Sequence, residues 1–179
     1  MINVSEIITS KPVNFNSELH KMVYNTLEKL EIPFERVDTD EAITMEDCVE
    51  IGRKLDTNIV KTLFLCNRQK TNFYLFITTD DKPFVTKDFS RVLGISHVSF
   101  ASPEMLFDML GTKVGAATVL SCVFDEKNKV RIILDKDAVS GRWYGCSDGT
   151  TTGYMKLKTE DLIHKYIPFA NHIPTIIEI

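Results

Sequence analysis

The sequence lacks the spacing patterns that bind metals or pair cysteines. Its four cysteines, Cys48, Cys66, Cys122 and Cys146, are scattered, and no two of them have the C-x-x-C spacing of a zinc or redox site. The four histidines form no ligand pattern either. We therefore expect reduced and unpaired thiols, no metal site and no cofactor.

Long apolar runs and an excess of basic charge are also missing. No segment has the unbroken apolar length of a membrane helix, and the N-terminus, MINVSEIITSKPVNF, has no basic start followed by an apolar run. We expect a cytoplasmic protein without a membrane partner. The net charge of −4 argues against a protein that coats nucleic acid non-specifically, and DNA is not an expected partner. A local basic patch that grips one end of an RNA is still compatible with this charge.

Conventional catalytic motifs are absent as well. The chain contains no G-x-S-x-G elbow, no Walker A motif, no G-x-G-x-x-G fingerprint and no paired-carboxylate signature. An enzyme with this sequence would have to work through positioning, backbone N–H donors and a cation.

The helix signals that are present divide the chain into short elements. A length of 179 residues fits one domain with a real core, and we expect an irregular lead-in over residues 1–16 and the domain over 17–179. The first helix is predicted to begin after the cap Ser17 and to stop before Pro33, and the second to begin at a capping box of Thr44 and Asp47 and to run to about Leu55. A third helix, TKDFSRVLG, ends at Gly94, and a fourth begins at Ser102 and Pro103 and ends at Gly111. Thr159 is predicted to cap the last helix.

Strand-like runs alternate with these helices. They are Phe34–Val37, Ile59–Cys66, Phe73–Thr79, His97–Phe100, VGAATVLSCVF, VRIILD, Tyr154–Leu157 and the C-terminal HIPTIIEI. The turn DEKNK predicts a hairpin between VGAATVLSCVF and VRIILD, and residues 140–153 are predicted to form a polar loop. This order indicates an α/β (α+β) single domain with a mixed, mostly antiparallel sheet or a partial barrel, flanked by helices.

Three stretches are candidate site material. Lys61 interrupts the apolar run IVKTLFLCN, and such a lysine either extends to the rim of the sheet or faces an anion. The glycines of GTKVGAAT let backbone N–H groups approach a ligand, although a glycine after a helix is more often only a C-cap. WYGCSDGTTTG contains the only tryptophan, an aspartate and three threonines, although polar turns of this kind are structural more often than functional.

The order of these stretches resembles the YbaK/prolyl-tRNA synthetase-associated domain family, in particular its free-standing PrdX-type deacylases. The resemblance covers about Ser17 to the C-terminus and rests on VDTDEAITMEDC, NIVKTLFL, TKDFSRVLG followed by VSFASPEMLFDMLGTKVGAAT, VRIILDKD and YGCSDGTTTG. Members of that family hydrolyse aminoacyl-tRNAs that carry the wrong amino acid.

The resemblance implies a role for each stretch. Lys61 matches the functional lysine, which faces the sugar-phosphate of the CCA end or the ester itself, and Gly111 and Gly115 match the loop that holds the aminoacyl group; these three are the implied catalytic residues. The implied tRNA-binding residues are Lys87 and Arg91. The implied substrate-binding residues are Thr44, Thr62, Tyr144, Asp148 and Thr151.

The chain departs from the family pattern at several of these positions. The segment H-P-x-x-N-x-x-T of the family aligns with YGCSDGTT, so that Tyr144, Gly145 and Asp148 replace its histidine, proline and asparagine. Thr62 stands where asparagine is common, and Val114 where proline is common. Tyrosine can still donate a hydrogen bond, but it cannot act as a base near neutral pH.

The resemblance implies a trans-editing deacylase that hydrolyses the ester of a mischarged tRNA, with alanyl-tRNA(Pro) as the first candidate. Cysteinyl-tRNA(Pro) or another misacylated tRNA is the second candidate, and a non-catalytic module that binds a tRNA end or an amino acid is the third. The expected partner is the acceptor end of tRNA, with a prolyl-tRNA synthetase as a further candidate.

Overall fold

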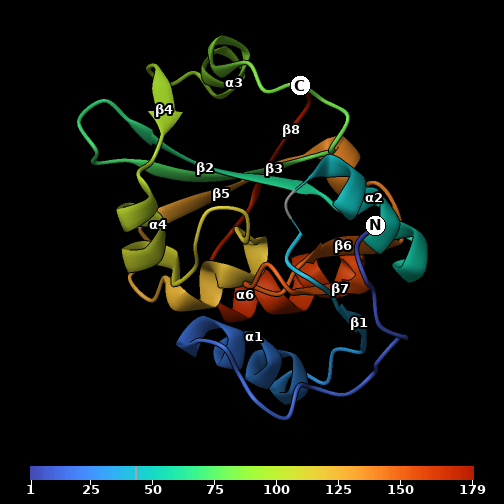
Figure 1. The fold of residues 1–179 in the computed structure, drawn as a ribbon. Coiled ribbons are helices and arrows are strands. Elements are labelled where there is room, and N and C mark those ends of the chain that lie inside the picture. The colour runs from blue at the N-terminus through green and yellow to red at the C-terminus, as the bar shows by residue number, and fades with distance from the viewer. Residues whose placement is uncertain (43) are drawn as a thin grey trace.

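The structure, a computed structural model, describes residues 1–42 and 44–179 and contains two sheets (Figure 1). The larger sheet has the strand order β4 (Val98–Phe100), β2 (Lys61–Asn67), β3 (Phe73–Thr78), β5 (Val130–Asp135) and β8 (Thr175–Ile177). The smaller sheet has the order β1 (Phe34–Asp38), β7 (Gly153–Lys158) and β6 (Trp143–Ser147).

The strand pairings are mostly antiparallel. In the larger sheet β2 pairs antiparallel with β3 and β4, whereas β5 pairs parallel with β3 and β8. Both pairings of the smaller sheet are antiparallel. The N–H of Val60 donates to the carbonyl of Gly145 over 2.9 Å and joins the two sheets, which form no closed barrel within the described residues. The predicted mixed, mostly antiparallel α/β domain is therefore confirmed.

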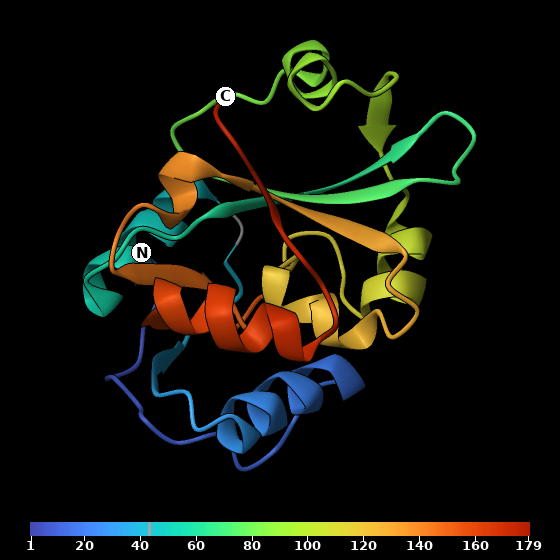
Figure 2. The ribbon, with the colours of Figure 1, turned by 180° about the vertical axis from the view of Figure 1, so that it is seen from behind.

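The helices lie on both sides of the larger sheet. Helix α3 (Thr86–Leu93) covers one face, and on the other side Figures 1 and 2 show α4 (Pro103–Leu110), the C-terminal helical segments, the smaller sheet and, furthest from the larger sheet, α1 (Glu18–Lys29). Helix α2 (Met45–Leu55) lies near one end of the sheets. The remaining helical segments are η1 (Val119–Phe124), η2 (Lys136–Val139), α5 (Thr159–Asp161), η3 (Leu162–Tyr166) and α6 (Ile167–Phe169).

Side-chain alternation along β2 supplies both layers of the core. Phe64 belongs to the main cluster, which also contains residues of α1, α4 and η1, whereas Leu65 packs with Phe89 of α3 in a second cluster. A third cluster includes Ile51 of α2 and Tyr154 of β7. Because successive residues of a strand point to opposite faces, each position on β2 belongs to one of the two layers.

The predicted helix boundaries hold at most positions. The Ser17 and Ser102 hydroxyls accept backbone N–H groups at the starts of α1 and α4, and Thr44 forms the predicted capping box with Asp47 at the start of α2. Gly94 and Gly111 adopt left-handed conformations at the ends of α3 and α4. Thr159 differs from the prediction, because it is the first residue of α5 and Lys158 is the cap.

Two predicted strand assignments are wrong. VGAATVLSCVF, expected to form a hairpin strand, is a loop followed by the 3₁₀ segment η1, which begins where the Thr118 hydroxyl accepts the N–H of Leu120. The apolar residues of η1 are buried or partly buried, whereas Val114 in the preceding loop is exposed, and an apolar run does not by itself distinguish a strand from a buried helical segment. Conversely, Trp143–Ser147 in the predicted polar loop is strand β6.

The lead-in runs beside the smaller sheet. Isolated bridges join Val4 to Thr39 and Ile8 to Arg36, both antiparallel. None of the helices over residues 1–42 and 44–179 has the length and apolar character that crossing a membrane requires. The four cysteines are free thiols, and three of them are buried.

Candidate active site

The loop after α4 combines two left-handed glycines with free backbone donors. Gly111 has φ of 69° and Gly115 has φ of 91°, a region that L side chains rarely adopt. A Cβ on Gly111 would also lie 2.9 Å from the Phe124 ring. In the part of the chain that the structure describes, the N–H groups of Val114 and Gly115 donate to no protein acceptor. Residues 111–118, called the glycine loop below, can therefore donate hydrogen bonds to a ligand.

The glycine loop is hydrogen-bonded to the turn that follows β6. The Thr112 hydroxyl donates to the carbonyl of Gly149 over 3.0 Å. The Ser147 hydroxyl donates to the carbonyls of Thr150 over 2.7 Å and of Ala116 over 3.4 Å. Two stretches that the sequence singles out therefore meet in space, although about 30 residues separate them. Residues 147–151 are called the β6–β7 turn below.

Thr151 connects this turn with the segment before α2. Its methyl group would lie 3.7 Å from a Cβ on Gly115, its hydroxyl donates to the Glu41 carboxylate over 3.3 Å, and its carbonyl accepts the N–H of Ala42 over 3.0 Å. Thr44, the exposed cap of α2, follows two residues after Ala42. The structure thus brings together Gly115, Thr151 and the segment of Glu41 and Ala42 that precedes α2.

Asp148 is held by protein donors on both carboxylate oxygens. Its Oδ2 accepts the Tyr24 hydroxyl over 2.7 Å and Nε2–H of His20 over 3.0 Å, and its Oδ1 accepts the N–H and the hydroxyl of Thr150 over 3.1 Å and 2.7 Å. Only 2% of Asp148 is exposed. Burial and the negative charge of Asp148 raise the pKa of Tyr24 well above its ordinary value, so Tyr24 stays a donor.

Lys61 lies elsewhere. It pairs with Thr78 in the sheet and shares the face of Leu63 and Leu65, which is opposite to the face of Phe64. Its Nζ donates to the carbonyl of Lys82 in the segment after β3. The ammonium of Lys61 therefore does not approach the glycine loop in this structure, and its catalytic role stays a prediction.

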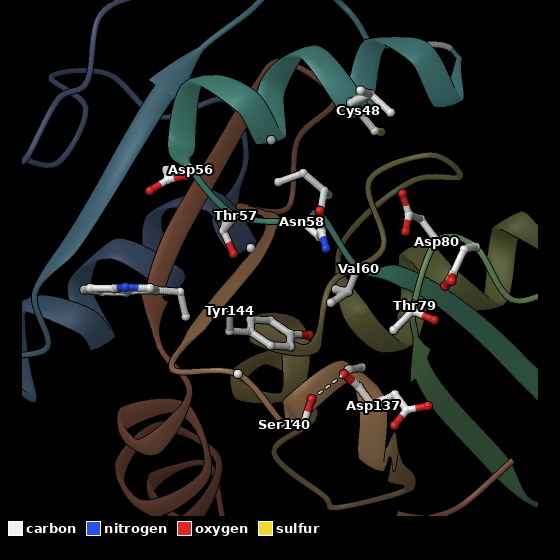
Figure 3. Close-up of a pocket in the computed structure, with 18 of the residues that line it drawn as sticks. Cys48, Asp56, Thr57, Asn58, Val60, Thr79, Asp80, Asp137, Ser140 and Tyr144 are labelled. Atoms are coloured by element: carbon white, nitrogen blue, oxygen red, sulfur yellow. Dashed lines mark hydrogen bonds between the residues drawn. The ribbon is translucent and has the colours of Figure 1, made fainter.

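Tyr144 lines a cavity of about 760 Å³ between α2, the start of β2, the end of β3 and the start of β6 (Figure 3). Its hydroxyl is fully buried and has no hydrogen-bond partner among the described residues. Burial raises the pKa of this hydroxyl well above its ordinary value. Val60, one residue before Lys61, lines the same cavity, as do Asp80 and Asp81. Tyr144 thus lies at the Lys61 end of β2, and the glycine loop is not part of this cavity's lining.

The remaining predicted residues fall on the two sides of the larger sheet. Lys87 and Arg91 lie exposed on α3, where Arg91 pairs with Asp88 over 3.2 Å. They share the α3 side with Lys61. Thr62, the next residue of β2, alternates to the side of Phe64 and the glycine loop.

Two neighbours of the site, His20 and Tyr24, were not expected from the sequence. Both are buried on α1, where they alternate with the core residues Leu19, Val23 and Leu27. A histidine and a tyrosine four residues apart on the apolar face of a helix are the signal that could have indicated a buried polar partner.

Comparison with known proteins identifies the chain's relatives. The aminoacyl-tRNA editing domain model matches residues 39–165. The chain is 25% identical over 168 residues to "Prolyl-tRNA synthetase associated domain-containing protein 1" from Danio rerio, which covers 93% of this chain and 88% of the relative. It is 26% identical over 136 residues to "Prolyl-tRNA editing protein ProX" from Acetoanaerobium sticklandii, which covers 76% of this chain and 83% of the relative.

A solved structure shares the fold. A proposed trans-editing enzyme for prolyl tRNA synthetase superposes with a TM-score of 0.65 at 15% sequence identity, covering 91% of this chain and 98% of that chain. The family match covers well over half of the 179 residues. The protein therefore belongs to the aminoacyl-tRNA editing domain family and is an aminoacyl-tRNA deacylase, a hydrolase.

Proposed function

We propose that this protein acts in trans on mischarged tRNA(Pro) and that alanyl-tRNA(Pro) is its main substrate. The names of its relatives, which refer to prolyl-tRNA editing and to prolyl-tRNA synthetase, support the choice of tRNA. The enzyme would bind the acceptor end of the tRNA in the cytoplasm. A prolyl-tRNA synthetase, which releases the mischarged tRNA, is the proposed protein partner.

The observation that carries this proposal is the free N–H groups of Val114 and Gly115 on the glycine loop. Directed at the ester carbonyl oxygen, they would stabilise the negative charge that develops there when a nucleophile attacks. Positive φ at Gly111 and Gly115 gives this loop a shape that other residues rarely allow. Catalysis of this kind needs no side-chain nucleophile, in agreement with the absence of conventional catalytic motifs.

Water is the nucleophile in the proposed reaction. The hydroxyls of Thr112 and Ser147 already donate to backbone carbonyls, and the hydroxyl of Thr151 donates to Glu41. A water oxygen bonds to the ester carbon, the bond from that carbon to the ribose oxygen breaks, and a proton from the water ends on the ribose oxygen. The neighbouring ribose hydroxyl of the substrate positions the water.

The proposed preference for a small amino acid depends on the side chains around the glycine loop. Thr151 stands beside Gly115, and Thr62 faces the same side of the sheet. These side chains would exclude larger groups, and discrimination of one methylene group is worth about 1–3 kcal/mol. Thr44 at the start of α2 and Tyr144 in the neighbouring cavity are the further substrate-binding candidates. Asp148 contributes through the turn that it holds, because both of its oxygens are occupied by protein donors.

The cations on the other side of the sheet would contact the nucleic acid. Lys61, at the start of β2, would reach the sugar-phosphate of the CCA end, and Lys87 and Arg91 on α3 would contact acceptor-stem phosphates. For Lys61 this requires that its ammonium leave the carbonyl of Lys82 when tRNA binds.

A deacylation panel with purified protein tests the proposal. We expect fastest release of amino acid from alanyl-tRNA(Pro), slower release from cysteinyl-tRNA(Pro), and neither from prolyl-tRNA(Pro). Lys61→Ala should abolish turnover without changing the circular dichroism spectrum, whereas Lys70→Ala, which changes an exposed lysine in the β2–β3 turn, is the matched control. Release from none of these tRNAs, with measurable binding, would favour a binding module over an enzyme.

A further inference from the structure

We propose that helix α1 is part of the editing site and that His20 and Tyr24 are positioning residues. They act through Asp148, which holds the β6–β7 turn and through it the glycine loop. The inference rests on the proposed function, because it assigns how that site is kept in shape. Neither residue falls within the segment 39–165 that the family model matches. The set His20, Tyr24, Asp148 and Thr150 is called the Asp148 network below.

The Asp148 network is complete within the protein. The carboxylate accepts two hydrogen bonds from α1 and two from Thr150, at distances between 2.7 Å and 3.1 Å. Because both oxygens are occupied and the residue is buried, it has little capacity left for a substrate. The Asp148 carboxylate therefore links α1 to the backbone of the β6–β7 turn.

The two ring nitrogens of His20 have different partners, and only Nε2 faces Asp148. Its Nδ1 accepts the backbone N–H of Asn16 over 3.1 Å, so this nitrogen carries no proton. The remaining proton is then on Nε2, which donates to Asp148. Helix α1 begins at this point, where the Ser17 hydroxyl accepts the N–H of His20, so the imidazole is fixed by the start of the helix as well.

The turn leaves the carboxylate no freedom to move. A Cβ on Gly153 would lie 2.2 Å from Oδ2 of Asp148, so only glycine fits there. The N–H of Asp148 donates to the carbonyl of Gly153 over 3.1 Å. Gly149, next to Asp148, has φ of 97°, which a glycine accommodates without strain. A shift of Asp148 would therefore displace the turn as a whole.

The turn passes this constraint to the glycine loop. The carbonyl of Gly149, directly after Asp148, accepts the Thr112 hydroxyl, and the Ser147 hydroxyl, directly before Asp148, lies 3.4 Å from the carbonyl of Ala116 while it donates to Thr150. Thr112 and Ala116 flank the free N–H groups of Val114 and Gly115. Catalytic rates depend on the placement of hydrogen-bond donors within about half an ångström. Removing His20 or Tyr24 should therefore shift Asp148 and the β6–β7 turn, and the turn should then displace the N–H donors of the glycine loop.

Kinetics of four variants test the proposal, with the full chain and alanyl-tRNA(Pro). We expect His20→Leu to lower kcat about tenfold with KM within about twofold, since it misplaces donors without removing a substrate contact. His20→Gln keeps an N–H donor and should recover kcat to within about threefold of the wild type. Tyr24→Phe keeps the ring and should lower kcat about threefold. His172→Leu removes a different buried histidine–aspartate pair and should leave kcat unchanged while the protein is folded.

Amide hydrogen exchange gives a second readout that needs no substrate. His20→Leu should speed exchange about tenfold at the hydrogen-bonded amides of Asp148, Thr150 and Ala116, and His172→Leu should not. The proposal is overturned if the His20→Leu protein keeps wild-type kcat, if exchange rises only in α1, or if His172→Leu changes kcat and the glycine loop equally. If His20→Leu does not fold, Tyr24→Phe decides by the same two measurements. A wild-type protein that deacylates no tRNA would refute the proposed function, and the exchange data would still decide the positioning role.

Discussion

His20–Asp148 and His172–Asp125 are both buried histidine–aspartate pairs, with 3.0 Å and 2.8 Å between Nε2 and the carboxylate oxygen. They differ at the second ring nitrogen. Nδ1 of His20 faces the N–H of Asn16 and must accept, whereas Nδ1 of His172 faces the carbonyl of Ala170 and must donate. A ring between two acceptors is favoured in its doubly protonated form, so the surroundings of His172 favour the imidazolium, whereas the N–H of Asn16 requires that Nδ1 of His20 carry no proton.

The comparison shows that the backbone around a histidine decides its charge. Burial by itself would lower the pKa of His172, but hydrogen bonds to Asp125 and Ala170 and the charge of Asp125 outweigh burial, and the pKa lies above its ordinary value. The pKa of Asp125 is lowered despite burial, because His172 and backbone N–H groups donate to it. The His172 pair thus contributes charge-dependent stability at the end of η1 without a hydrogen bond to the glycine loop, whereas the His20 pair orients a turn that is bonded to that loop.

Removing each aspartate should give the largest contrast. Asp125→Ala leaves a buried imidazolium and the N–H groups of Lys129 and Val130 without their acceptor, so we expect a loss of about 3–4 kcal/mol in the free energy of unfolding at pH 6. Asp148→Ala leaves four buried donors, from His20, Tyr24 and Thr150, without their acceptor and should cost a similar amount, about 3–4 kcal/mol. Urea denaturation measures both losses. The contrast lies in activity: only Asp148→Ala should lower kcat, by about tenfold or more, because only this variant releases the β6–β7 turn. Equal kcat for the two variants would place the Asp148 network outside the site.

The pH dependence of stability sharpens the same contrast. Because the folded-state pKa of His172 is raised, its contribution is fully present below the unfolded pKa of about 6.5 and is lost as the pH rises through the folded pKa. The lowered pKa of Asp125 adds stability above about pH 4, which is lost as the pH falls through the folded value.

The stability difference between wild type and His172→Gln should therefore be greatest near pH 5–6 and shrink towards pH 8. The size of this stability difference is set by the shift in the pKa of His172 between the unfolded and folded states, at about 1.4 kcal/mol for each tenfold change in proton affinity. Urea titrations across this pH range measure it. A difference that is constant over the range would mean that His172 is neutral in the folded protein.

A pair of glycine variants tests the functional side of the comparison. Gly115→Ala and Gly94→Ala both place a side chain at positive φ, and each should cost about 1 kcal/mol in the free energy of unfolding. Gly94 ends α3, and a Cβ there would meet nothing within 4 Å. Only Gly115→Ala should impair deacylation, by tenfold or more on the scale of one lost oxyanion donor. Equal activity of the two variants would remove the glycine loop from the mechanism.

Tyr144→Phe should have the smallest effect on stability. Its buried hydroxyl has no partner among the described residues, so removal should be neutral or stabilising by up to about 1 kcal/mol. Tyr166→Phe, which removes a buried 2.7 Å hydrogen bond to the carbonyl of Leu120, is the control that should lose about 1 kcal/mol. In the deacylation assay, a loss of about tenfold, the worth of one hydrogen bond, would show that substrate binding opens access to this hydroxyl, and unchanged activity would place the substrate elsewhere.

Local signals predicted the helix boundaries well and the strands less well. Ser17, Thr44 and Ser102 act as caps because a side-chain oxygen near a helix start satisfies a donor that no tertiary contact supplies. Apolar periodicity misassigned Val119–Phe124, because a fully buried segment has no solvent side to reveal its period. Strand β6 was missed because polar residues in and after it, such as Ser147, suggested a loop. In the structure the Ser147 hydroxyl is buried and bonded to the carbonyl of Thr150, which the sequence does not reveal.

The candidate site divides in the same way. The glycine after a helix predicted the left-handed end of α4 at Gly111, and the composition of WYGCSDGTTTG marked that stretch as candidate site material. The separation of Lys61 from the glycine loop was not predicted, because it depends on which face of β2 each side chain takes once both faces are covered. His20 and Tyr24 were visible only as polar residues at core positions of a helix.

By itself the sequence determined the elements whose causes are local: capped helices, glycine turns, apolar strands and the family to which the chain belongs. Only the tertiary structure decided which of two similar aspartates holds the β6–β7 turn and which binds a charged histidine. The reason is physical. Hydrogen bonds between residues 20 and 148 or 125 and 172 join segments far apart in sequence, and the charge of a buried ring depends on the atoms that packing places around it.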